Sequence, residues 1–128
     1  MLVELDDTMR LNIVQQLFND MFPFLKIEFF EQDVKVNGNV AARRHISNTN
    51  RKLGEFRHRH SNNSNVGFRP EMTVNELEKS FAHLYHLQTQ VFRKSGKIWL
   101  ETTITDGWSL DEQNRQGEII TAQMGINK

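Results

Sequence analysis

Two blocks of regularly spaced apolar residues restrict the folds open to this chain of 128 residues. In the first block, apolar residues from Thr8 to Phe22 recur three and four positions apart, the spacing of one buried helix face. Pro23 interrupts this pattern, and residues 24–31 then alternate between apolar and polar side chains. The first block therefore predicts a helix followed at once by a strand with one face toward the core.

The second block begins with a helix-start signal. Thr73 and Glu76 have the spacing of a capping box, and Met72 with Leu77 has the spacing of the hydrophobic staple around it. The apolar stripe that follows predicts a helix that runs to about His86.

Two alternating segments, residues 88–93 and 97–104, follow this helix on either side of Ser95-Gly96. This arrangement predicts a tight antiparallel hairpin. Beyond the hairpin, Ser109 and Glu112 repeat the capping-box spacing and predict a last helix.

The middle of the chain carries weaker signals. Asn37-Gly38 lies among valines and is typical of a two-residue hairpin turn. Lys52 to Arg59 is a candidate strand, although its two apolar residues are an odd interval apart. Residues 61–65 are loop by composition.

The resulting order of elements predicts an α+β fold. It is a circular permutation of the ferredoxin-like order, so we expect an antiparallel sheet with helices on one face and an added C-terminal helix. A chain of 128 residues with a 38% hydrophobic fraction fits one domain with its own core, and we expect residues 1–128 to form it.

Four segments, residues 72–77, 90–96, 99–103 and 108–110, resemble a small uncharacterised bacterial family of hypothetical proteins with a ferredoxin-like fold. The resemblance covers less than half of the chain. It implies the same fold, and it implies no site residue because that family has no assigned activity.

Charge is segregated along the chain although the total is neutral. Between Val34 and Pro70 lie eight Lys or Arg and a single acid, Glu55, a net charge of +7. Residues 1–33 carry two basic and seven acidic side chains, and residues 71–128 carry six and eight. We expect residues 32–70 to form a long, flexible basic segment.

Such a segment can hold an anion through many weak contacts, so the first functional hypothesis is a non-catalytic module that binds nucleic acid or another polyanion. The alternative is that these cations pair with acids of the same molecule or of a neighbour. The candidate nucleic-acid-binding residues are Arg43, Arg44, Arg51, Lys52, Arg57 and Arg59.

The second hypothesis is a homo-oligomeric scaffold. Trp99 is out of phase with Ile98 and Leu100, so it lies on the opposite sheet face, together with Phe92. If helices cover only the other face, Trp99 and Phe92 form an apolar patch, which is typical of an interface. Cover by the basic segment or by the last helix is the alternative.

A metal-dependent hydrolase is the third and weakest hypothesis. His58 and His60 leave the same face of a strand and His45 could join them, but the spacing matches no recognised zinc site. The chain has no Gly-rich phosphate loop and no Gly-x-Ser-x-Gly elbow, so we predict no catalytic residue, metal or cofactor.

Composition limits the cellular setting. The absence of Cys excludes disulfides and thiolate metal sites, which is compatible with a reducing compartment. No segment has the length and apolarity of a membrane helix, and the N-terminus lacks the pattern of a signal peptide. We therefore expect a cytoplasmic protein without a membrane partner.

Overall fold

The computed structural model of the chain describes residues 2–31, 35–36, 39–40, 43–57 and 65–126. Within these ranges its elements are β1 (Val3–Glu4), α1 (Leu11–Met21), β2 (Leu25–Glu31), β3 (Lys35–Val36), β4 (Asn39–Val40), β5 (Arg44–His45), the 3-10 turn η1 (Leu53–Phe56), β6 (Gly67–Phe68), α2 (Val74–Tyr85), β7 (Leu87–Ser95), β8 (Ile98–Glu101) and α3 (Leu110–Ile126).

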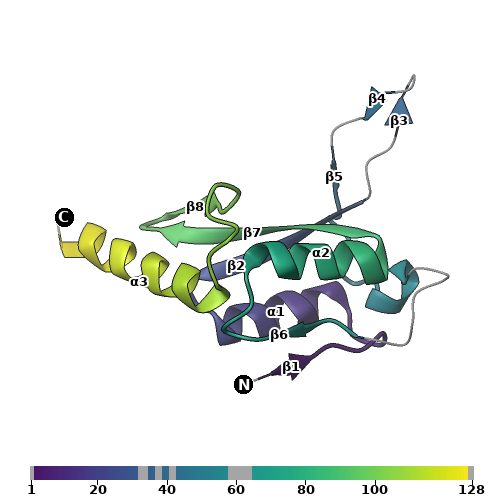
Figure 1. Ribbon diagram of the computed structural model, residues 1–128, viewed down its shortest axis with the longest axis horizontal. Helices are drawn as coiled ribbons and strands as arrows, with labels where there is room; N and C mark the ends of the chain where they lie inside the picture. Colours follow the sequence, from purple (N-terminus) through teal and green to yellow (C-terminus); the bar gives the residue numbers. More distant parts are fainter. Residues whose placement is uncertain (1, 32–34, 37–38, 41–42, 58–64, 127–128) are drawn as a thin grey trace.

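A four-stranded antiparallel sheet in the order β5-β2-β7-β8 organises the chain (Figure 1). The long central pairing runs from Leu25 opposite Arg93 to Glu31 opposite Leu87. Two short antiparallel ribbons, β1 with β6 and β3 with β4, complete the described strands. The α+β class and the antiparallel sheet are therefore confirmed.

The predicted helices form where their sequence signals lie. In α1, the side chains of Leu11, Val14 and Phe18 are fully buried, as the three-and-four spacing predicts. The capping box at the start of α2 is present, with the Glu76 N–H donating to Thr73 Oγ1 at 3.1 Å.

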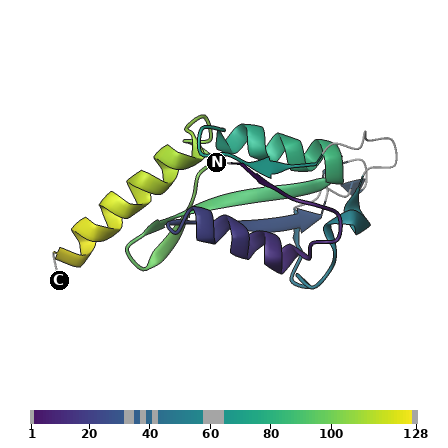
Figure 2. The same ribbon diagram turned by 90° about the horizontal axis from the view of Figure 1, so that it is seen from below.

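The core lies on one face of the sheet. Leu25, Ile27 and Phe29 alternate along β2 and are at most 1% exposed, and the Phe29 ring packs edge-on against Phe81 of α2 at 5.5 Å. Figures 1 and 2 show α1 and α2 on this same side, while α3 projects past the end of the sheet. No described helix covers the opposite face.

Three expectations need correction. The ferredoxin-like topology is not confirmed, because the strands that directly follow a helix lie at the edges of a ferredoxin-like sheet, whereas β2 and β7 follow α1 and α2 here and are central. The candidate strand Lys52 to Arg59 is wrong: its described residues include the turn η1, which buries Leu53 completely.

The third correction concerns the end of the hairpin. The alternation predicts a strand as far as Ile104, but β8 ends at Glu101. Thr102 turns inward, where it is 1% exposed and its hydroxyl donates to the Val91 carbonyl at 2.9 Å. Ile104 then lies in a turn, 99% exposed.

Among the described residues, no helix combines the length and the apolarity that crossing a membrane requires.

Candidate nucleic-acid interface

The sheet face without helices, called the open face below, is defined by strand alternation and register. Side chains out of phase with the core residues of β2 meet their partners from β5, β7 and β8 on this face. Most of these side chains are half-buried. The open face consists of Lys26, Glu28, Phe30, His45, Gln88, Gln90, Phe92, Lys94, Trp99 and Glu101.

One half of the open face is centred on Lys26. Its ammonium nitrogen lies 5.2 Å from the ring centroid of Phe92 and 5.1 Å from that of Trp99. Both distances are within the range of a cation–π contact. The structure thus places Phe92 and Trp99 together on the face that alternation predicts, and it adds a lysine between them.

The other half is centred on Phe30. The Arg43 guanidinium lies 4.2 Å from the Phe30 ring centroid, and the His45 ring packs edge-on at 5.4 Å. His45 Nε2 lies 3.0 Å from a carboxylate oxygen of Glu28. A cation stacked on an aromatic ring therefore occurs in both halves of the open face.

Other arginines of the basic segment bind acids of the same molecule. Arg57 donates to both carboxylate oxygens of Asp7, at 2.7 and 2.8 Å, and to the Tyr85 hydroxyl at 3.0 Å. Arg51 lies 3.6 Å from Glu55 and 4.0 Å from Glu31. Part of the charge segregation is thus internal pairing between the acidic N-terminal residues and the basic segment.

The cluster of Asp7, Arg57 and Tyr85 is structural in character. The hydrogen bonds from Arg57 hold the pKa of Asp7 below its usual value. Burial, reinforced by Asp7, raises the pKa of Tyr85 to about 12. Because the Arg57 side chain is only 20% exposed and binds both neighbours, it has little surface to offer a ligand.

The remaining candidates are dispersed. Arg44 is 70% exposed and lies 3.4 Å from Glu31 at the end of β2. Lys52 is exposed, but it is bridged through its backbone to Arg10 at the start of α1. Arg59 lies outside the described residues. Of the five arginines and one lysine predicted to bind nucleic acid, Arg43 is the one that the structure brings next to the open face among the described residues.

Most residues of the open face, including Lys26, Gln88 and Gln90, were not among the sequence candidates. Their alternation with the core residues could have placed each on an outward face. That they share one surface follows from the antiparallel register of β2 with β7, in which Lys26 is opposite Phe92 and Glu28 is opposite Gln90. Nothing in the local pattern specifies this register.

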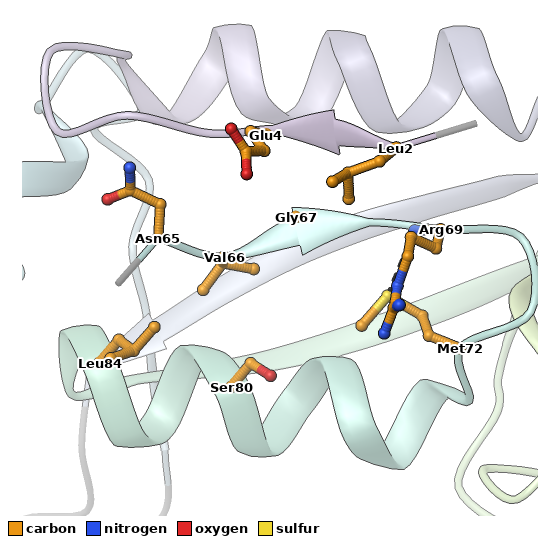
Figure 3. A pocket seen from close by; sticks show the side chains of 9 residues that line it. All are labelled: Leu2, Glu4, Asn65, Val66, Gly67, Arg69, Met72, Ser80 and Leu84. Carbon is orange, nitrogen blue, oxygen red and sulfur yellow. Dashed lines mark hydrogen bonds between the residues drawn. The ribbon is translucent and has the colours of Figure 1, made fainter. Parts of the chain in front are cut away.

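A cavity of about 260 Å³ lies between the β1–β6 ribbon and α2 (Figure 3). Its lining mixes apolar side chains with Glu4, Arg69 and Ser80. The Ser80 hydroxyl already donates to the Glu76 carbonyl at 2.9 Å. We find in this cavity no pair of nucleophile and base among the described residues.

The predicted histidine group falls mostly outside the described residues, since His58 and His60 lie there and only His45 is placed. Among the residues that are placed, no group of three His, Asp or Glu side chains is arranged to hold a metal ion. The resemblance to a bacterial family stays a prediction, because no protein-family model, curated protein or solved structure matches this chain.

Proposed function

We propose that this protein is a non-catalytic binding module for single-stranded nucleic acid, with the open face as its contact surface. The observation that carries the proposal is the interleaving of aromatic rings and cations on one sheet face. Arg43 stacks on Phe30, and Lys26 lies over both Phe92 and Trp99.

Single-stranded nucleic acid needs two kinds of contact, which this face offers side by side. Bases stack on aromatic rings, each stack contributing about 1–3 kcal/mol, while phosphates are held by lysine and arginine. The rings belong to three neighbouring strands, β2, β7 and β8, so successive bases can cross the sheet from one ring to the next. Gln88, which is half-buried, adds an amide group beside them.

The acid in the middle of this face, Glu28, does not oppose the proposal, and Glu101 lies at the end of β8. Glu28 contacts His45 at 3.0 Å and Lys26 at 3.9 Å, so its charge is offset locally. Arg44 on the edge strand β5 and Lys52 before η1 are further exposed cations, but they do not belong to the open face. We assign Arg51 and Arg57 to internal pairing instead, on the contacts described above.

The test uses the tryptophan on the open face as a reporter. Trp108 lies elsewhere, over Arg93 at 5.5 Å, so Trp108→Phe leaves Trp99 as the protein's sole indole. Titration with oligothymidine should quench Trp99, and the affinity should fall steeply as salt rises. Lys26→Glu and Arg43→Glu should each weaken binding about tenfold or more.

The matched control is Arg115→Glu on α3, a 68% exposed arginine away from the open face. It makes the same charge change and should leave the affinity within about twofold. Equal losses in Arg43→Glu and Arg115→Glu would indicate a net-charge effect and contradict a defined surface. Absence of quenching at low salt would also contradict the proposal.

A homo-oligomeric scaffold remains a second candidate because of a different surface. On the face opposite Trp99, Ile98 is 59% and Leu100 is 40% exposed. Trp108 in the adjoining turn is 41% exposed. Apolar groups at this exposure favour contact with a second copy. A monomer in light scattering at high protein concentration would remove this candidate.

A further inference from the structure

Within the described residues, part of one edge of β7 has no neighbouring strand, because β8 pairs with β7 only between Phe92 and Ser95. The Thr102 N–H then donates to the Val91 carbonyl at 3.2 Å, which shows that Val91 directs its backbone groups toward this edge. Thr89, two residues earlier, directs its own N–H and carbonyl to the same edge, beyond the end of β8.

A cavity of about 280 Å³ lies at this edge, between α2 and the open face. Glu78 of α2 lines one side, Thr89 lines the strand, and Arg43 lines the cavity as well. Because the same Arg43 stacks on Phe30, the cavity adjoins the surface proposed to bind nucleic acid. Its volume is below that of most drug-sized sites and suits a fragment such as one nucleobase.

Two polar groups at this cavity are removed from solvent. The hydroxyl of Thr89, a residue only 5% exposed, has no hydrogen-bond partner in the described part of the chain. Such a buried hydroxyl is costly unless something pairs with it. The Glu78 carboxyl is desolvated, and its pKa is raised to about 7 by burial and by Asp106, against the opposing effects of Arg43 and the Val91 N–H.

We propose that this cavity binds a guanine base of the nucleic acid held on the open face, an inference that rests on the proposed function. Guanine carries the acceptors O6 and N7 on one edge, which match the paired donors of Arg43. Its N1–H and N2–H₂ donors lie on another edge and match the carboxylate of Glu78. Thr89 offers a backbone N–H and a carbonyl at the strand edge beside them.

The two roles of Arg43 are compatible. Stacking on Phe30 uses the flat face of the guanidinium, whereas hydrogen bonds to O6 and N7 use the N–H groups in its plane. Other bases fit this arrangement less well. When Glu78 is ionised, adenine would place its N1 acceptor against the carboxylate, and the pyrimidines lack the N7 acceptor that pairs with arginine.

The experiment compares oligothymidine with the same oligomer carrying one central guanine, using Trp99 quenching in the Trp108→Phe protein. The guanine oligomer should bind roughly tenfold more tightly, the discrimination expected of one good bidentate pair. Glu78→Gln keeps the side-chain shape but removes an acceptor, and it should abolish the preference while leaving oligothymidine binding unchanged.

The matched control is Glu118→Gln, an exposed carboxyl on α3, which should keep the full preference. Equal affinity of the unsubstituted Glu78 protein for the two oligomers would overturn the guanine inference and leave the proposed function standing. If neither oligomer binds, the proposed function fails, and guanosine monophosphate is then compared with adenosine monophosphate by amide chemical shifts. Shifts at Thr89 with the guanine nucleotide alone would support the cavity, and their absence would overturn it.

Discussion

The two faces of the sheet use similar residues for opposite purposes. On the packed face, Arg57 binds Asp7 and Tyr85, and the ring of Phe29 packs against Phe81 with no exposure. On the open face, Arg43 and the ring of Phe92 keep part of their surface exposed. Residue type therefore does not tell whether a side chain makes a buried structural contact or stays available at the surface. The partners supplied by distant parts of the chain decide this.

Truncating one phenylalanine on each face gives the largest contrast. Phe29→Ala should lower the free energy of unfolding by about 3–5 kcal/mol, because it leaves a cavity in the core. Phe92→Ala should lower it by less than about 1.5 kcal/mol, because the ring is partly exposed, yet weaken oligonucleotide binding about tenfold. Urea unfolding and Trp99 quenching measure the two effects. Similar stability losses would mean that the open face is covered.

Removing one arginine from each region is the next comparison. Arg57→Met should cost roughly 1.5 kcal/mol, discounted for the 42% exposure of Asp7, because it leaves Asp7 and Tyr85 without their shared donor. Arg43→Met should cost under about 0.5 kcal/mol. Urea unfolding at neutral pH measures both losses. A larger loss in Arg43→Met would show that Arg43, and not Arg57, makes the stabilising contact.

Acid provides a related test. Since Arg57 lowers the pKa of Asp7 in the folded protein, the ionised carboxylate contributes stability that is present above the unfolded value, near 3.8. This contribution is lost as the pH falls through the folded pKa. The difference in free energy of unfolding between the protein with Arg57 and the Arg57→Met variant should therefore shrink as the pH falls. Urea unfolding at successive pH values measures this difference, and a constant difference would rule out the electrostatic explanation.

Glu78 should show the opposite dependence. Its pKa in the folded protein, about 7, exceeds its usual value of 4.5, so its neutral form stabilises the fold below that usual value. That stability is lost as the pH rises through about 7. Glu78→Gln should become the more stable form at alkaline pH by about 1–2 kcal/mol, with little difference in acid. The charged groups that face Glu78 are Asp106, Arg43 and Lys79. A stability difference between the two proteins that does not change with pH would show that Glu78 has no such effect.

The smallest expected effects concern two glycines of α3. A Cβ at Gly117 would lie 2.9 Å from Phe24 Cβ and 3.1 Å from Arg93 Cγ, so Gly117→Ala should cost about 1 kcal/mol by pushing the helix outward. A Cβ at Gly125 meets nothing within 4 Å, so Gly125→Ala should stabilise by about 0.5 kcal/mol. Thermal unfolding measures both changes in stability. If both variants were stabilised, or both destabilised, the close packing of Gly117 against Phe24 and Arg93 would be contradicted.

Local signals predicted much of this fold. The capping box of Thr73 and Glu76, the stripe of α1 and the turn at Ser95-Gly96 are each encoded within a few neighbouring residues. The turn η1 and the β1–β6 ribbon were missed because each depends on distant contacts. Leu53, for example, is positioned by a hydrogen bond from its backbone N–H to the Met9 carbonyl at 2.8 Å.

The candidate site was predicted only in part for the same reason. Alternation alone placed Trp99 and Phe92 on a common face. Whether an arginine is engaged depends on its partner, and Arg57 and Asp7 are fifty residues apart in the chain. Strand register and long-range ion pairs are properties of the folded molecule, so neither Lys26 beside Trp99 nor the edge of β7 could be identified from local spacing.

The position of Arg43 between the Phe30 ring and the β7 cavity has a thermodynamic consequence. Under the function and the guanine site proposed above, a base on Phe30 and a base in the cavity would be linked through this one guanidinium, and their binding free energies would not be additive. A strand that occupies both would order this side chain once instead of twice. Spacing between two such bases would then act as a second criterion of selection, alongside the identity of each base.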